Sequence, residues 1–250
     1  MNNEIPETEV LTEDEQIASI LEHLPAETEI DVEVPSRGIP YFGKEGLLRV
    51  RPMTFEDEKS LSTGSRTASF NPANYLLSKC VSNVDVDKLL LLDKLFLLLK
   101  VRELSYGADY KVGSVCPQCN YENTLNLEID KLLSVSVPKD FNFMGREVFL
   151  KGIKKNATVS FLTVGDENFL DPAVLSENIW RYVTSIDGVD DQRIISKVIS
   201  QLPIMDIHIL IKELMLSDYG VQPSVRYVCD SCNNSNLVSL PLDENFFSVN

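Results

Sequence analysis

The chain has 250 residues, 44% hydrophobic and 24% charged, a composition that excludes a wholly disordered chain and suits one or two domains with a core that folds without disulfide bonds. Its net charge of −15 comes largely from residues 1–36, which hold eleven acidic side chains and no lysine or arginine. Because a negative field repels phosphate backbones, general nucleic-acid binding is disfavoured.

No signal peptide or membrane span is expected in this chain. The N-terminal residues lack the basic and apolar segments of a signal peptide. The leucine-rich stretch at 89–104 is broken by charged residues, and its longest apolar run, Leu95–Leu99, is far shorter than a span. We therefore expect a soluble protein of the cytosol.

Residues 1–34 are predicted to form an acidic N-terminal arm. Within it, aliphatic side chains recur at helical spacing over 13–24, and Pro25 ends the pattern. Thr12 and Glu15 match a capping box at the start of this helix. The pattern indicates either a solvated arm or an amphipathic helix that binds a partner, and the short apolar stripe favours the solvated arm. The aliphatic side chains are Ile17, Ile20, Leu21 and Leu24.

Residues 35–134 are predicted to form the first of two repeats. Turn residues at 36–41 and a short strand at 47–51 precede three helices. The predicted helix starts are a capping box at Thr54–Asp57, an N-cap at Asn71 followed by Pro72, and an N-cap at Asp85 or Asp87.

The third of these helices extends through the leucine-rich stretch to about Leu104. Its apolar residues point in nearly all directions, so we expect it to be buried on most faces. Cys80, at the end of the second helix, is predicted to be an inert thiol in the core. Strands predicted at 109–115 and 124–129 flank the first Cys-x-x-Cys motif.

Residues 135–250 are predicted to form the second repeat, with the same order of elements. Strands are expected at 147–152 and 158–162, a capping box at 163–166, and helices at 172–185, 190–200 and 204–216. The acidic segment 187–191 is interpreted as a turn that leads into a helix cap, because it lacks the ligand alternation of a calcium loop. Two further strands flank a second Cys-x-x-Cys motif.

The clearest internal repeat aligns Tyr106–Asp130 with Tyr219–Asp243 without a gap. Both segments begin with Tyr-Gly, continue after seven residues with Val-Cys-x-x-Cys-Asn-x-x-Asn, and end in alternating apolar residues and an aspartate. The repeat predicts a duplicated strand–knuckle–strand unit. We therefore expect an α+β fold in which two related halves each carry helices and a β-hairpin with a zinc knuckle, joined as a pseudo-symmetric site like that of a zinc ribbon.

The four knuckle cysteines are the candidate metal ligands. One knuckle supplies two thiolates, whereas structural zinc takes four ligands in a tetrahedron, so two facing knuckles complete one site. We expect one structural zinc per chain, with the knuckles meeting within one chain or between two chains. The adjacent Asn120 and Asn233 suit the tight turn and are candidate donors to sulfur. The predicted ligands are Cys116, Cys119, Cys229 and Cys232.

Two other interpretations of the motifs stay open. A redox-active Cys-x-x-Cys stands at a helix N-terminus after a strand, whereas here a second strand follows and the motif occurs twice, which favours metal. The knuckles could also persist as hairpins without metal. No phosphate-binding lysine loop, dinucleotide motif or nucleophile elbow is present, and the two histidines, His23 and His208, have no catalytic neighbours in the pattern. We therefore predict no enzymatic activity, no catalytic residue and no residue that binds an organic cofactor.

An ordered set of short elements resembles the T-even-type baseplate hub proteins of contractile-tailed phages, a family that includes a small hub subunit and a hub assembly factor. The elements are the segments at 34–41, 50–54, 57–59 and 93–99, Tyr106-Gly107, and the motif Cys116-Pro117-Gln118-Cys119. The resemblance covers about residues 34–130, and the second Cys-x-x-Cys agrees with it.

The resemblance implies a non-enzymatic protein that is made in the host cytoplasm and helps to build the central hub of a phage tail baseplate. The resemblance implies that its partners are other hub and tail proteins and not nucleic acid. A retained subunit would be located in the tail baseplate of the virion. Whether copies of the chain associate with one another stays open. The alternatives are a zinc-ribbon module that binds nucleic acid and, less favoured, a thiol oxidoreductase.

Overall fold

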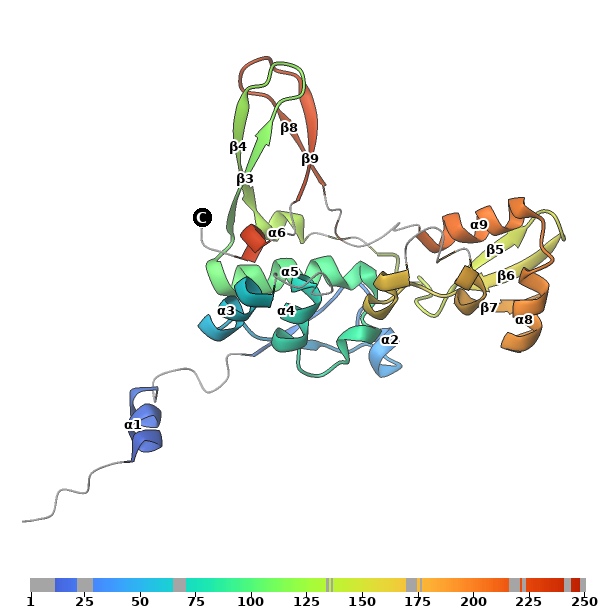
Figure 1. Ribbon diagram of the computed structural model, residues 1–250, viewed down its shortest axis with the longest axis horizontal. Coiled ribbons are helices and arrows are strands. Elements are labelled where there is room, and N and C mark those ends of the chain that lie inside the picture. The colour runs from blue at the N-terminus through green and yellow to red at the C-terminus, as the bar shows by residue number, and fades with distance from the viewer. Residues whose placement is uncertain are drawn as a thin grey trace, which may run out of the picture.

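The computed structural model describes residues 12–21, 29–64, 71–133, 135, 137–169, 175, 177–215, 221, 224–240 and 244–247. Figure 1 shows four parts: the separate helix α1, a central helical region, a pair of β-hairpins that project from it, and a lobe of strands and helices at one end. Within the described residues, no helix is long and apolar enough to cross a membrane.

Helix α1 (Glu13–Ile20) confirms the predicted capping box. The N–H of Glu15 donates to the Thr12 hydroxyl, and the Glu15 carboxylate accepts from the Thr12 N–H at 2.8 Å. None of its residues is buried. The end of the predicted helix, at Leu24 and Pro25, lies outside the described residues.

The central region combines a small antiparallel sheet with helices. Thr54 and Asp57 form the predicted box at the start of α3, and the Asn71 side chain caps α4. The elements are β1 (Ile30–Val32), α2 (Ile39–Phe42), β2 (Leu48–Val50), α3 (Phe55–Gly64), α4 (Pro72–Cys80), the 3₁₀ turn η1 (Val86–Lys88) and α5 (Leu91–Tyr106).

The predicted third helix is divided into two elements. Asp85 caps η1, whereas α5 begins at Leu91 without a side-chain cap. The reason is a backbone bridge between Leu90 and Thr163, in which Leu89 accepts from Val164 and Leu91 donates to Leu162. These bonds hold Leu89 and Leu90 extended, so a continuous helix cannot form there.

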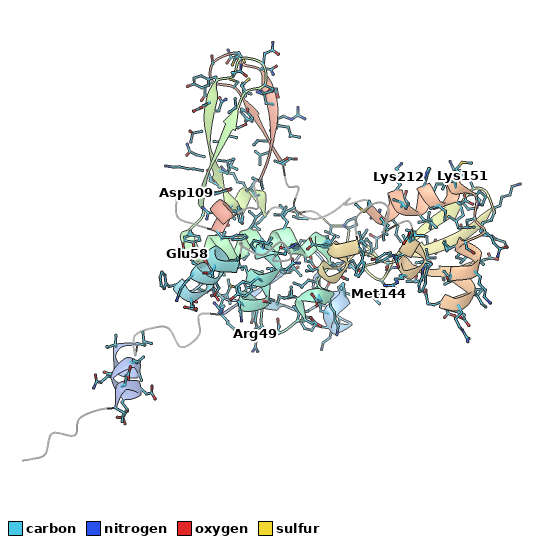
Figure 2. All side chains as sticks on the ribbon, viewed as in Figure 1. Arg49, Glu58, Asp109, Met144, Lys151 and Lys212 are labelled. Carbon is cyan, nitrogen blue, oxygen red and sulfur yellow. The ribbon has the colours of Figure 1, made fainter. Side chains whose placement is uncertain are left out.

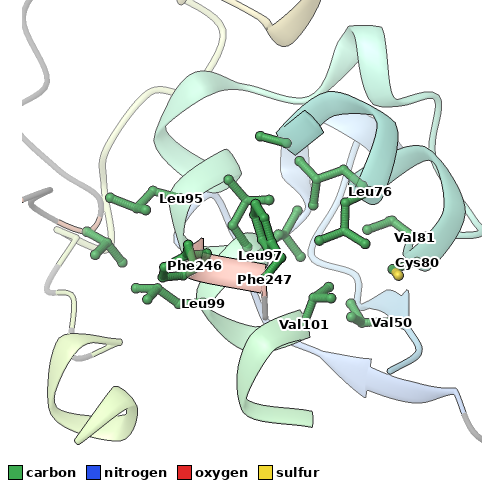
Figure 3. Packing of buried hydrophobic residues seen from close by; sticks show 14 of the residues in the cluster. Val50, Leu76, Cys80, Val81, Leu95, Leu97, Leu99, Val101, Phe246 and Phe247 are labelled. Carbon is green, nitrogen blue, oxygen red and sulfur yellow. The ribbon is translucent and has the colours of Figure 1, made fainter. Parts of the chain in front are cut away.

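Helix α5 is the centre of the larger hydrophobic core, as its all-round apolar pattern predicts. Leu97, Leu98, Leu99 and Val101 are fully buried. Figure 3 shows Leu97, Leu99 and Val101 among side chains from β2, α4 and the C-terminal turn η4 (Glu244–Phe247). Cys80 is part of this core, and burial raises the pKa of its thiol to about 12, in agreement with an inert role.

Both hairpins rise from the same part of α5. Tyr106 ends α5 shortly before the first hairpin, β3 (Asp109–Val115) and β4 (Glu122–Glu128), which leads into α6 (Ile129–Leu132). The second hairpin, β8 (Ser224–Val228) and β9 (Ser235–Ser239), precedes η4. Arg102 donates to the Phe246 carbonyl and the Tyr106 hydroxyl donates to the Phe247 carbonyl, both at 2.8 Å. The two hairpins therefore stand side by side (Figure 1).

The second lobe has its own hydrophobic cluster, formed by residues between 148 and 214. The Asp191 side chain caps α8 as predicted. The elements are β5 (Arg146–Leu150), β6 (Lys155–Val159), the 3₁₀ turns η2 (Val164–Phe169) and η3 (Ile179–Tyr182), β7 (Val183–Ile186), α8 (Gln192–Ile199) and α9 (Ile204–Met215). The three strands form one antiparallel sheet in the order β5-β6-β7.

The helix predicted at 172–185 is wrong at its C-terminal end. Val183–Ile186 is a strand paired with β6, because its buried Val183 and Ile186 complete the sheet face that packs on the lobe's core. Residues 172–174 and 176 of that helix lie outside the described part of the chain. The 187–191 segment is a turn, as predicted: Asp187 and Gly188 have positive φ, and Val189 bonds back to Ile186.

The mixed helix-and-strand class is confirmed, but within the described residues a pseudo-symmetry of the two halves is not seen beyond the hairpins. The first half carries a two-stranded sheet and the second a three-stranded one. The second hairpin and η4 also pack in the core of the first half, through Val225, Val238 and Phe246. The prediction that residues 35–134 and 135–250 are duplicated repeats stays a prediction.

A buried carboxylate fixes the first turn of the body against α5. Asp93 is fully buried, and it accepts hydrogen bonds from the Ser36 N–H at 2.9 Å and from the Tyr41 hydroxyl. The Tyr41 oxygen accepts in turn from the N–H of Leu90. Burial raises the pKa of Asp93 from 3.8 to about 6, against the effect of these hydrogen bonds.

We predict that Asp93 makes the protein less stable as the pH rises from about 4 to about 6. The folded state binds this proton more tightly than the unfolded state. The resulting stabilisation is therefore complete when the pH is below the unfolded-state pKa of Asp93, and it is lost as the pH rises through the folded-state pKa. Relative to Asp93→Asn, the wild type should lose up to about 3 kcal/mol of unfolding free energy between about pH 4 and pH 7. Urea unfolding at several pH values measures this difference, and a difference that does not change with pH would contradict it.

Candidate metal centre

The four knuckle cysteines converge at the tips of the two hairpins. Their sulfurs all lie within 4.8 Å of one another. Two sulfur–sulfur contacts run between the hairpins: Cys116 Sγ lies 3.7 Å from Cys232 Sγ, and Cys119 Sγ lies 3.7 Å from Cys229 Sγ. Cys116 and Cys229 are buried, whereas Cys119 and Cys232 are exposed. The knuckles therefore meet within one chain, which resolves one alternative that the sequence left open.

Each tip is a tight turn, and the two turns have the same pattern of backbone hydrogen bonds. The N–H of Asn120 donates to the Cys116 carbonyl, and the N–H of Asn233 donates to the Cys229 carbonyl, both at 2.9 Å. Both asparagines have φ of 56°, the left-handed conformation that asparagine tolerates better than most residues. The role predicted for Asn120 and Asn233 in the turn is thus confirmed.

The side chains that contact sulfur belong to the second asparagine of each repeat. Asn123 Nδ2 lies 3.7 Å from Cys229 Sγ, and Asn236 Nδ2 lies 3.6 Å from Cys116 Sγ. Each amide thus donates to a cysteine of the opposite hairpin. Sequence reasoning assigned this donation to the neighbouring asparagines, although the Asn-x-x-Asn spacing of both repeats contained the signal.

Local donors favour a thiolate at the buried end of the cluster. The N–H of Cys232 is the main cause that lowers the pKa of Cys229 to about 6, with support from Ser231, Cys119 and Asn123. At Cys232, the Asn234 N–H favours the thiolate, but desolvation and the neighbouring thiols raise its pKa to about 12. Four sulfurs so close together cannot all ionise unless a cation balances their charge.

The arrangement fits a tetrahedral thiolate-bound metal. Zinc–sulfur bonds of about 2.3 Å place sulfurs about 3.8 Å apart in a regular tetrahedron. The observed spacings of 3.7 Å match this value, and the amide donors resemble the outer hydrogen bonds that orient metal ligands. A redox-active motif instead pairs the two cysteines of one Cys-x-x-Cys, whereas these contacts run between motifs. The other residues weighed as sites do not join the cluster: His208 is exposed on α9, and His23 lies outside the described residues.

The fold and this centre define a mixed helical and stranded protein whose two projecting hairpins are joined by four cysteines. Comparison with known families gives its affiliation: residues 26–248 match the family described as "T4 bacteriophage base plate protein". Because the match covers most of the chain, the chain belongs to this family and is a phage baseplate protein. No curated protein and no solved structure matches the chain.

We predict that Asn123→Ala destabilises the protein more than Asn236→Ala. Asn123 is 2% exposed and also accepts from the Asp230 N–H at 3.0 Å, so its loss leaves partners in both hairpins unpaired. The expected loss of unfolding free energy is about 1–3 kcal/mol for Asn123→Ala. Asn236 is half-buried and serves as the matched control. Urea unfolding of the two variants measures the difference, and equal losses would show that the burial of Asn123 and its bond from the Asp230 N–H add no stability.

Proposed function

We propose that this baseplate protein acts, without enzymatic activity, in building the central hub of a contractile phage tail, and that one structural zinc joins its two hairpins. The proposal is supported by two observations taken together. Residues 26–248 match the baseplate family, and four cysteines cluster at the tips of the two hairpins, which project together as one arm. A two-stranded hairpin is marginally stable by itself, so a cross-link at the tips gives the arm a fixed shape.

The joined hairpins offer a surface for protein partners. Four large apolar side chains of the hairpins are exposed, at Val115, Tyr121, Val228 and Leu237. Figure 1 shows that the tips of the hairpins extend away from the central helices and from the second lobe, and none of these four side chains belongs to either hydrophobic cluster. Exposed apolar residues on a rigid projection are typical of contact sites between proteins.

The charges of the hairpins disfavour the nucleic-acid alternative. The basic side chains are Lys111 and Arg226, against the acidic Asp109, Glu122, Glu128 and Asp230. A phosphate backbone needs a surplus of positive charge, which this surface lacks. A hub or tail protein is therefore the favoured partner.

We predict about one zinc per chain in protein purified without a metal-affinity tag. Substitution of any of the four cysteines by serine removes a ligand, so each variant should lose zinc and melt at a lower temperature, because binding at such a site contributes folding free energy. Cys80→Ser is the matched control, since Cys80 lies in the core and outside the cluster.

Elemental analysis and thermal melting test the zinc proposal together. Less than about a tenth of a zinc per chain, with unchanged melting in the four serine variants, would contradict it. A disulfide within either motif that forms and breaks reversibly, in the absence of bound metal, would instead favour the thiol oxidoreductase.

The hub role predicts where the protein is found during infection. A retained hub subunit should occur at a fixed ratio to other hub proteins in purified, disassembled baseplates, as measured by quantitative mass spectrometry. An assembly factor should be abundant in the host cytoplasm of infected cells and absent from particles, with hub assembly lost when its gene is deleted. If deletion leaves hubs intact and the protein is absent from baseplates, the proposal is wrong.

A further inference from the structure

Helix α1 presents an apolar stripe that contacts nothing in the described part of the chain. Ile17, Ile20 and Leu21 are 47%, 79% and 47% exposed, and they share one face of the helix. Acidic residues fill the first turn, at Glu13, Asp14 and Glu15. A helix of this kind is expected to lay its apolar face in a groove when one of suitable charge is present.

The second lobe carries such a groove between η3, α8 and α9. It has a volume of about 700 Å³ and is open to solvent. Its lining is predominantly aliphatic and aromatic, formed by Trp180, Ile199, Leu202, Ile204, Ile207 and Ile211. Ile204 is 69% exposed, so a large apolar surface is left in water at the end of this lobe.

Exposed basic residues neighbour the lining residues on the same elements. Lys197 lies one turn before the lining Ser200, and Lys212 lies one turn after the lining His208; both lysines are exposed. Figure 2 shows Lys212 on the outer side of α9. Arg181 is also exposed, with its guanidinium over the Trp180 ring at 5.5 Å. Glu177 is the one acidic residue of the lining.

We propose that the groove binds helix α1 of a second copy of this chain. The helix offers three aliphatic side chains to an apolar groove, and its acidic first turn is opposite in charge to the basic residues that neighbour the groove, so polarity and charge agree. Figure 1 places α1 and the lobe of α8 and α9 at opposite ends of the molecule, which favours a contact between copies over one within a copy.

Such a contact is heterologous, because a helix of one copy meets a groove of the next. Each added copy still offers a free helix and a free groove, so the contact generates a ring if it closes and a row of copies if it does not. A helix of 8 residues buries less surface than a stable interface needs, so the contact is weak alone and is strengthened when copies are held close together. The inference does not depend on the metal or on the hub role.

The test measures self-association of the 250-residue chain, as purified, by sedimentation velocity from about 5 μM to about 500 μM. Wild-type protein should associate increasingly with concentration. Ile20→Glu in the helix and Ile204→Glu in the groove should each raise the dissociation constant roughly tenfold or more, because each places a charge in the apolar contact. Phe55→Glu on α3 is the matched control, since Phe55 is as exposed as Ile20 and lies on neither surface.

A mixture of the two variants distinguishes this contact from a symmetric one. Ile20→Glu retains its groove and Ile204→Glu retains its helix, so an equimolar mixture should recover dimers with one copy of each and should form no larger species. A rise in salt from about 50 mM to about 500 mM should weaken the wild-type contact by screening the acidic helix from the basic residues that neighbour the groove.

Three outcomes overturn the inference. They are a wild-type chain that stays monomeric at all concentrations, self-association that both variants leave unchanged, and a mixture that fails to recover dimers. A helix that docks within its own chain gives the first of these outcomes, and a symmetric dimer through another surface gives the second or the third.

Discussion

The burial of α5 on most of its faces is the constraint from which the rest of the architecture follows. A largely apolar helix must be covered by other segments, and here β2, α4 and the C-terminal turn η4 supply much of the cover. Arg102 fixes η4 in place: its guanidinium is buried, donates to the Phe246 carbonyl and lies 4.4 Å from the Tyr110 ring. Because β3 follows α5 and β9 precedes η4, the same packing sets the bases of both hairpins side by side.

The paired hairpins then depend on two different interactions along their length. At the base, Tyr110 and Val112 are part of the main core, so the strands are held by hydrophobic burial. Towards the tips there is no core, and hydrogen bonds between the hairpins take over, from Ser114 to Tyr227 at 3.0 Å and from Asp230 to Asn123. The four sulfurs lie at the tips, in a geometry in which a tetrahedral metal would cross-link the two hairpins.

The second lobe is joined to the central region by polar contacts at η2. Lys94 of α5 lies 2.6 Å from the Glu167 carboxylate, which also accepts from Asn74 of α4. The bridge between Leu90 and Thr163 adds a backbone connection beside this ion pair. The lobe of α8 and α9 and the tips of the hairpins lie on separate parts of the molecule (Figure 1).

The sequence by itself determined what local patterns encode: the capping boxes, the strands around each Cys-x-x-Cys, the burial of the leucine-rich helix, and the cysteines as a set, because caps and alternating patterns act within a few residues. Tertiary structure alone decided the rest. Backbone pairing with Thr163 divided a predicted helix at Leu90, and sheet pairing turned Val183–Ile186 into a strand. The repeated Asn-x-x-Asn spacing marks Asn123 and Asn236 as candidates, but their choice as sulfur donors, and of one chain for both knuckles, depended on contacts between residues more than a hundred positions apart.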